Sequence, residues 1–397
     1  MRIGFAEALL IAAILLLAWT YGGYLGFLTF LSWFRVARPA SDSAPDLLPT
    51  VTAIIPVYNG GEAITQKLQD MLSLEYPPDR LDILVGSDGS TDATVLLTEA
   101  CNSPRVKLLA FADRRGRALV CNDAAAATNS EWLLFTDIDA RLDRAFLMRM
   151  ARHFADRAIG VLDGSISCVN EGQSSLARDV GLYWRLESKQ KTLESHLGIL
   201  SSTFGNCTAV RREIYRPLRA SEDVDFTVPL EAIGLGYRVV HEPEARVNDL
   251  AHSDLRSQFQ ARVRMVTKNL PGTLRKWPLL WDKPLIGLSI VSHKLLRWFT
   301  PILLLLALAT NLLLAGQPAY RALLLAQGVF YLLGLLGAIG WLARRQIPLA
   351  SSIFSFLVAA AGFFVGTLNS LRGIEIAYYR PYRGEVAKPG GRRYGRG

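Results

Sequence analysis

Cysteine is scarce in this sequence, with four residues among 397, and histidine occurs only five times. The cysteines are widely spaced, with no Cys-x-x-Cys pair and no histidine cluster nearby; they are Cys101, Cys121, Cys168 and Cys207. Structural zinc sites and disulfide frameworks need closely patterned ligands or paired cysteines. The pattern therefore argues against both and favours free thiols in a reducing compartment.

Acidic residues are almost missing from the apolar stretch at residues 5–34, where Glu7 stands alone. This stretch is longer than the core of a signal peptide, and no small-residue cleavage site follows a short core. The sequence therefore predicts a retained transmembrane anchor over residues 1–36, rather than a cleaved secretory signal. Residues 37–49, rich in Pro, Ser and Asp, are predicted to be a linker.

A second apolar region predicts C-terminal transmembrane helices over residues 299–371, with candidate spans at 299–315, 322–341 and 349–371. Residues 281–298 carry His293, Lys294, Arg297 and Trp298 among apolar neighbours, which is typical of a helix lying in the headgroup plane. The net charge of +9 gathers beside the apolar stretches. This favours a cytosolic middle domain by the positive-inside rule and disfavours nucleic-acid binding.

The basic tail, residues 372–397, conflicts with a simple count of spans. One span before a cytosolic domain and three after it would place the tail outside, against its positive charge. Either one C-terminal segment is re-entrant or interfacial, or the rule fails here.

The middle region, residues 50–280, is predicted to be an α/β domain. Short apolar runs at 51–57, 81–85, 106–110 and 132–136 alternate with helical patterns at 62–74, 92–101 and 116–128. Such alternation predicts a mostly parallel sheet with helices on both faces, and ligands bind beyond the carboxyl ends of its strands. Those ends carry Tyr58, Asp88, Asp137 and Asp139.

Asp137 and Asp139 form an Asp-x-Asp directly after the predicted strand 132–136. Two carboxylates so spaced can hold Mg²⁺ or Mn²⁺ together with a diphosphate, because hard cations take oxygen ligands. The alternative is a capping aspartate beside a solvated one. Three further patterns are weak alone: residues 86–92 (GSDGSTD), the acidic residues 221–226, and the basic helix 258–269 with Arg262 and Arg264.

The order of these motifs resembles the family 2 glycosyltransferases, the group that includes the cellulose, chitin and hyaluronan synthases. The resemblance covers residues 50–270 and implies a GT-A-type nucleotide-sugar-binding domain. Residues 54–59 (IIPVYN) are similar to the first-strand motif that holds the base, which includes Pro56 and Tyr58, although Gly60 stands where an acidic residue is usual. GSDGSTD resembles the uracil-binding motif, with Asp88 at its key position.

The remaining motifs imply the other site residues. Residues 116–122 (GRALVCN) resemble a Gly-Lys-x-x-Ala-Leu-Asn segment and bring Arg117 and Asn122 to the nucleotide sugar. The resemblance places Asp139 on the cation with Asp137 near the ribose and diphosphate. Counting back from residues 236–238 (GYR) selects Asp225 as the catalytic base, with Asp223 as second choice.

The last motif, Gln-x-x-Arg-Trp in polymerising members, is altered to ARVRM, with Ala261 and Met265 at the Gln and Trp positions, which disfavours a processive enzyme. Arg262 and Arg264 are retained and would contact a pyrophosphate. Residues Tyr183, Trp184 and Glu187 are expected to line the acceptor pocket, with core packing as the alternative for the two aromatic residues.

The resemblance implies an inverting enzyme that transfers a sugar from a UDP-sugar to a lipid or growing glycan at the bilayer. Its expected location is a bacterial-type inner or plasma membrane with the catalytic domain in the cytosol. Polysaccharide synthesis and a single addition to a lipid both remain open. A non-enzymatic membrane scaffold or transporter is disfavoured because Asp88, Asp139 and Asp225 are all retained.

Overall fold

The computed structural model describes residues 4–35, 47–168, 175–249 and 255–376. Most of the predicted linker and of the basic tail lies outside these ranges. Within them, eight strands form one sheet in the order β3-β2-β1-β4-β7-β6-β8-β5. The strands are β1 (Val51–Val57), β2 (Leu81–Asp88), β3 (Val106–Phe111), β4 (Trp132–Phe135), β5 (Arg141–Leu142), β6 (Ile159–Cys168), β7 (Thr208–Arg211) and β8 (Arg238–Asp249).

The first half of the sheet follows the α/β prediction. Strands β3, β2, β1 and β4 are all parallel, and their burial is nearly continuous in β1, β2 and β4. The connecting helices are α3 (Ile64–Leu72), α4 (Thr94–Glu99) and α5 (Arg117–Ala126), as expected to within a few residues. Parallel strands direct their carboxyl ends to one edge, so the loops after β1, β2 and β4 lie together.

The second half adds two antiparallel strands, β7 and β5, to a sheet that is mostly parallel, as predicted. β7 is antiparallel to both β4 and β6, and β5 is antiparallel to β8, whereas β6 and β8 are parallel. Helices α6 (Phe146–Phe154), α7 (Ser175–Leu197) and α8 (Val224–Gly234) belong to this half. The pairing of β6 with β8 includes two register shifts.

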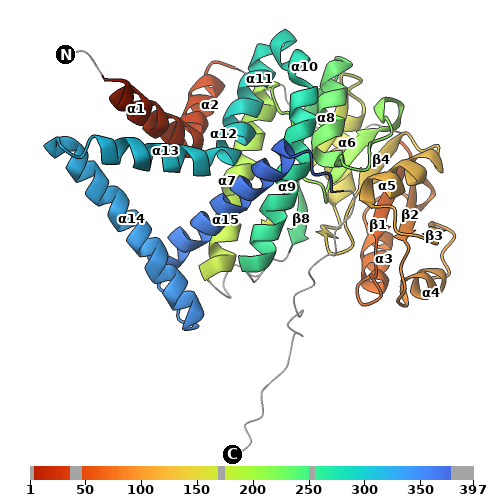
Figure 1. The fold of residues 1–397 in the computed structure, drawn as a ribbon. Helices are drawn as coiled ribbons and strands as arrows, with labels where there is room; N and C mark the ends of the chain where they lie inside the picture. Colours follow the sequence, from red (N-terminus) through yellow and green to blue (C-terminus); the bar gives the residue numbers. More distant parts are fainter. Residues whose placement is uncertain (1–3, 36–46, 169–174, 250–254, 377–397) are drawn as a thin grey trace, which may run out of the picture.

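Apolar helices gather on the side of the molecule away from β1 to β3 (Figure 1). Among the described residues, three helices are long and apolar enough to cross a membrane: Phe5–Ser32, α14 (Pro318–Leu342) and α15 (Pro348–Leu371). The first comprises α1 (Phe5–Ala18), the π-helical turn η1 (Trp19–Gly23) and α2 (Tyr24–Ser32).

The span predicted at residues 299–315 differs from the structure. Helix α13 (Thr300–Leu313) is too short by itself, and it joins the preceding helix Pro284–Trp298 at a bend of 65°. That preceding helix contains α11 (Pro284–Ile290), the π-helical turn η5 (Val291–Leu295) and α12 (Leu296–Trp298). The pair is therefore either one broken span or a re-entrant hairpin.

Helix α9 (Leu255–Arg275) connects the sheet domain to the apolar helices, because α15 lies along it (Figure 1). Two glycines of α15 allow this contact. A Cβ on Gly362 would lie 2.9 Å from the carbonyl oxygen of Phe259, and one on Gly366 would lie 2.8 Å from that of Val263. Small residues at such positions let two helix backbones approach closely.

Replacing Gly366 by leucine is therefore expected to separate α15 from α9. Overpacking of this kind costs about 1–3 kcal/mol, so the midpoint of thermal unfolding in detergent micelles should fall by several degrees. Gly328→Leu in α14 is the matched control, because a Cβ at Gly328 meets nothing within 4 Å. Equal midpoints for the two variants would contradict the close packing described here.

Candidate active site

The loops after β1 and β2 are joined by hydrogen bonds. Asn59, which has a positive φ of 51°, accepts a hydrogen bond from the amide of Thr91 through its side-chain oxygen at 2.8 Å. The amide of Asn59 donates to the hydroxyl of Ser90, and the amide of Gly60 donates to the hydroxyl of Thr94. The IIPVYN and GSDGSTD segments therefore form one continuous edge.

Asp88 ends β2 and lies buried against the start of α5. Its carboxylate accepts hydrogen bonds from the amides of Arg115, at 2.6 Å, and Gly116, at 3.0 and 3.1 Å. The guanidinium of Arg114 lies 3.9 Å from this carboxylate and 3.8 Å from the centre of the Tyr58 ring. The structure therefore brings together Tyr58 and Asp88, two of the residues predicted to bind the nucleotide.

Arg117 links α5 to the Asp-x-Asp loop. Its Nη2 lies 2.9 Å from Oδ1 of Asp137 and 2.6 Å from the carbonyl oxygen of Gly205, so the guanidinium bridges two loops. Asp137 is half-buried, whereas Asp139 is exposed. The predicted residues Arg117 and Asp137 thus form one unit, with Asp139 beside it toward solvent.

Asp225 lies on the other side of Gly205. A Cβ at Gly205 would lie only 3.4 Å from Cγ of Asp225, and the amide of Thr203 donates to the backbone carbonyl of Asp225 at 2.8 Å. Burial and then the neighbouring Asp223 raise the pKa of Asp225 to about 6, against the opposing charge of Arg117. A carboxylate with this pKa is suited to accept a proton near neutral pH.

Asp223, two residues earlier, is in a different electrostatic state. It precedes the first turn of α8, and Nζ of Lys268 in α9 donates to its carboxylate at 2.7 Å. Burial favours a higher pKa, but Lys268, Arg117 and Arg264 together hold the pKa of Asp223 below its usual range. Of the two aspartates selected from the sequence, Asp223 is therefore the ion-paired carboxylate and Asp225 is the more basic one.

The two arginines of ARVRM lie on different sides of α9. Arg264 shares a face with Lys268, one turn later, and acts electrostatically on Asp223. Arg262 instead lies 5.1 Å from the centre of the Tyr183 ring in α7 and 6.0 Å from that of Phe363 in α15. The structure thus brings Arg264 to the site and places Arg262 at the junction with the apolar helices.

Two other residues predicted to bind the nucleotide sugar, Asn122 and Pro56, make contacts within the domain. The amide of Asn122 bonds the backbone of Leu218 in both directions and accepts from the hydroxyl of Tyr215 at 2.9 Å, so it holds that loop. Pro56 lies within β1, paired with Gly86 of β2. Burial raises the pKa of the Cys121 thiol to about 12, which disfavours the reactive thiolate form.

Glu187 is buried in an ionic cluster rather than facing an open acceptor pocket. His293 lies between the carboxylates of Glu187 and Glu194, at 2.8 and 3.0 Å, and Arg297 lies 2.7 Å from Glu187. Trp184 packs edge-on against the Phe204 ring. The polar side chains expected in the headgroup plane therefore contact α7 instead, and they attach the bent helix pair to the catalytic side of the molecule.

Lys67 is a residue that the sequence analysis missed. It lies in α3, is 2% exposed, and donates to Thr136 Oγ1 and to the carbonyl oxygen of Ala140, directly flanking Asp137 and Asp139. Burial lowers its pKa to about 8, although the two aspartates act in the opposite direction. The sequence feature that could have identified it is a lysine on the apolar face of a predicted helix, because a buried ammonium normally has a specific partner or role.

The donor set of the Asp-x-Asp loop fits a hard divalent cation that is completed by a substrate. In the described ranges, no three His, Cys, Asp or Glu side chains gather as a metal site. Mg²⁺ characteristically takes one or two carboxylates together with substrate phosphates and water. Asp137 and Asp139 can therefore supply protein ligands, while a diphosphate would supply the others.

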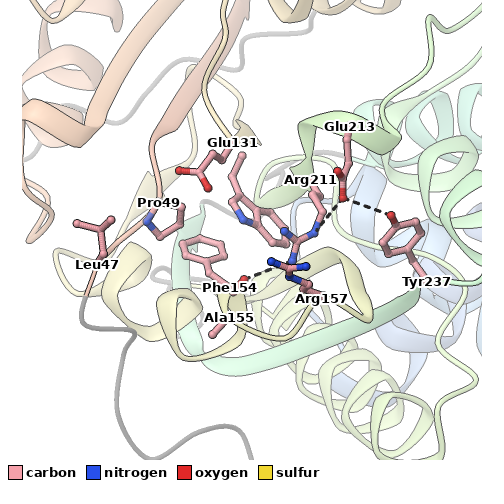
Figure 2. A pocket seen from close by; sticks show the side chains of 10 residues that line it. Leu47, Pro49, Glu131, Phe154, Ala155, Arg157, Arg211, Glu213 and Tyr237 are labelled. Carbon is pink, nitrogen blue, oxygen red and sulfur yellow. Dashed lines mark hydrogen bonds and ion pairs between the residues drawn. The ribbon is translucent and has the colours of Figure 1, made fainter.

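A pocket elsewhere in the domain lies at the opposite end of β4. It is lined by Trp132, the first residue of β4, together with Phe154, Arg157, Arg211 and Glu213 (Figure 2). Asp137 and Asp139 follow the last residue of the same strand. This hollow is therefore separate from the candidate active site.

The fold is similar to that of a solved enzyme. The mannosyltransferase PcManGT from Pyrobaculum calidifontis, in complex with GDP-Man and Mn²⁺, matches with a TM-score of 0.67 and 22% identity. The match covers 92% of this chain and 100% of that one. At this identity the likeness establishes the GT-A-type fold, and it extends over the apolar helices as well as the sheet.

Curated relatives share the glycosyltransferase region. An N-acetylglucosaminyltransferase of Rhizobium sp. (strain N33) is 24% identical, over 65% of this chain and 61% of its own length. A beta-monoglucosyldiacylglycerol synthase of Synechocystis sp. is also 24% identical, over 53% of this chain and 49% of its own length. The chain thus spans less than two thirds of the length of either relative.

The family model described as Glycosyl transferase family 2 matches residues 52–219. This segment contains Asp88, Arg117, Asp137 and Asp139, and it ends shortly before Asp223 and Asp225. Residues 52–219 therefore form a Glycosyl transferase family 2 domain, as the order of the motifs predicted.

Proposed function

We propose that the chain transfers a sugar from a nucleotide sugar to a membrane-associated acceptor, with inversion, in the synthesis of an extracellular or cell-envelope polysaccharide. The observation that carries this proposal is the meeting of two units at Gly205. Arg117, which is paired with Asp137, contacts its carbonyl oxygen, and Asp225 lies against its Cα. A proton acceptor thus adjoins the loop assigned to the diphosphate.

The donor is proposed to be a UDP-sugar, with its base near Tyr58, Arg114 and Asp88. An aromatic ring stacked on a guanidinium offers a flat surface, and a buried carboxylate offers an acceptor for a base N–H group. The similar mannosyltransferase was solved with GDP-Man, so guanine is the alternative base. Both are included in the experiment below.

Asp225 is proposed to accept the proton of the acceptor hydroxyl. That oxygen forms a bond to the anomeric carbon from the side opposite the diphosphate, while the bond from the anomeric carbon to the diphosphate oxygen breaks. The electron pair of the broken bond leaves with the nucleoside diphosphate. A bound Mg²⁺ or Mn²⁺, held by Asp139 and Asp137, would offset the charge that develops there. Arg117 and Arg264 orient and neutralise the same group.

The acceptor is proposed to approach from the apolar helices. Trp298 of α12 packs on Phe226, the residue after Asp225, with ring centres 6.0 Å apart. The proposed base therefore lies close to elements long and apolar enough to enter a bilayer. Because Met265 stands where polymerising members of the resembled group have Trp, a single addition to a lipid acceptor is the alternative function.

We also propose that the bent pair Pro284–Trp298 and Thr300–Leu313 is re-entrant. Two full spans, α14 and α15, would then follow the catalytic domain. This arrangement returns the basic tail to the cytosolic side, as the positive-inside rule requires, and removes the conflict met in the sequence.

The test is donor turnover by the purified full-length protein in detergent with membrane lipid extract and Mg²⁺ or Mn²⁺. UDP-sugars and GDP-sugars are offered singly, and nucleoside diphosphate release and product size are followed. We expect metal-dependent release from one UDP-sugar with a polymeric product. A product with one added sugar would establish the alternative, and release from GDP-sugars alone would overturn the assignment of uracil. No release with any donor, in the presence of lipid extract, would contradict the proposed function.

A further inference from the structure

Helix α3 holds the Asp-x-Asp loop at both of its ends. Nζ of Lys67 donates to Thr136 Oγ1 at 2.9 Å and to the carbonyl oxygen of Ala140 at 2.5 Å. These two residues immediately precede and follow the segment from Asp137 to Asp139. A single buried ammonium therefore joins the start of the loop to its end.

Burial of this cation is costly unless it has a specific role, because an ammonium loses its hydration inside a protein. Both hydrogen-bond partners of Lys67 are neutral oxygens, and the carboxylates of Asp137 and Asp139 are the charges that act most strongly on it. A methionine or leucine would satisfy packing at this position without that cost. The lysine is therefore better explained by the loop than by the core.

Two further contacts fix the same loop. Ile138, between the two aspartates, packs against Gly60. A Cβ on Gly60 would lie 2.3 Å from Cδ1 of Ile138 and 2.4 Å from Cγ2 of Val57. Asp70, one turn after Lys67, lies 3.1 Å from the guanidinium of Arg141, just beyond the loop. These contacts fix the loop at its middle and at both ends, whereas Asp139 faces solvent.

We propose that Lys67 is a positioning residue that presets Asp137 and Asp139 for the divalent cation of the donor complex, with Gly60 providing the space for Ile138. This inference rests on the proposed function, since it concerns the same cation site. Gly60 stands where the resembled family usually has an acidic residue, and the close approach of Ile138 explains why a larger side chain would disturb this loop.

Removal of Lys67 should change the affinity for Mn²⁺ in opposite directions through lost charge and through lost geometry, which makes the inference testable. A cation beneath the site repels a second cation, so loss of its charge alone should tighten Mn²⁺ binding. Loss of the link between Thr136 and Ala140 should instead free the two carboxylates to move apart and weaken binding. Loss of a group that orients metal ligands typically costs about 10–100-fold in affinity.

The experiment is a Mn²⁺ titration of the full-length protein with UDP present, in which free Mn²⁺ is measured by electron paramagnetic resonance. We expect Lys67→Met to weaken Mn²⁺ binding by about 10-fold or more. Gly60→Ala is a second variant that keeps the lysine, and it should weaken binding by displacing Ile138. GDP replaces UDP in a parallel titration, so that the assignment of the base does not decide the outcome.

Leu68→Ala is the matched control. It removes a buried side chain from the same helix, so it lowers stability, but it leaves both hydrogen bonds of Lys67 in place. We expect its Mn²⁺ affinity to equal that of the unmodified chain. Unchanged or tighter binding in both Lys67→Met and Gly60→Ala would overturn the inference. If the unmodified protein bound no Mn²⁺ with either nucleotide, the proposed cation site itself would be refuted instead.

Discussion

Asparagine in place of Asp225 is expected to abolish sugar transfer and, at the same time, to make the protein more resistant to heat at pH 7. Removal of a general base costs about 10²–10⁴-fold in rate. The gain in stability follows from the pKa of Asp225, which burial and Asp223 raise from 3.8 to about 6. A neutral amide does not bear the cost of a buried charge beside another carboxylate.

The direction of the change in folding stability follows from proton binding to Asp225. Between about pH 4 and 6 the folded state holds a proton on Asp225 that the unfolded state has lost, so this residue lowers stability progressively as the pH rises through that window. At pH 7 the loss is complete. The unfolding midpoint of Asp225→Asn in detergent should therefore exceed that of the unmodified protein by about 2–4 °C, and the excess should vanish near pH 4.

Asp223→Asn supplies the opposite result and serves as the control. The pKa of Asp223 is held low by Lys268, so its charge contributes stability above its usual titration range and loses that contribution as the pH falls. The variant leaves the ammonium of Lys268 without its anion, and its unfolding midpoint at pH 7 should fall. If both variants shifted the midpoint in the same direction, the assignment of Asp225 as the more basic carboxylate would be wrong.

The pKa of Asp225 should also determine the pH dependence of turnover by the unmodified enzyme. Because ionised Asp225 is the proposed base, kcat/KM should decline as the pH falls through about 6.

Alanine in place of Asp139 is expected to reduce metal-dependent release of the nucleoside diphosphate by about 10²–10³-fold, since a bound cation provides several kcal/mol of charge stabilisation. The unfolding midpoint should fall only slightly, because Asp139 is exposed but its charge favours the buried ammonium of Lys67. Donor turnover at saturating Mn²⁺ and the unfolding midpoint are the two measurements.

Asp143→Ala is a suitable comparison for Asp139→Ala, since it removes an aspartate four residues further along the chain. Turnover in this control should persist. Turnover that persists in Asp139→Ala as well would show that the cation is held elsewhere.

The first four strands and their parallel arrangement could be predicted from the sequence, because short apolar runs alternating with helical patterns are typical of a parallel sheet. The same runs placed Asp88, Asp137 and Asp139 at one edge. The second half of the sheet could not be predicted, since β6 and β8 carry buried polar residues such as Asp163, Glu242 and His241 that break the apolar pattern.

Within the site, the spacing of residues could identify Asp225 but could not explain its chemistry. The difference in pKa between Asp223 and Asp225 depends on Lys268, which lies 45 residues after Asp223 in the chain. Likewise, Arg262 and Arg264 look alike in sequence, and only the position of α9 between the sheet domain and α15 assigns them to different surroundings. Lys67 escaped notice because helical periodicity treats a long side chain as solvated.

The glycine contacts of α15 have a consequence for the environment in which this enzyme works. Helix α9 meets Asp223 on one side through Lys268 and meets Gly362 and Gly366 on the other. A membrane helix tilts to match the thickness of the bilayer around it. Because α15 and α9 are in close contact, a tilt of α15 would move the backbone that carries Lys268, and we expect the pH dependence of turnover to change with the thickness of the bilayer.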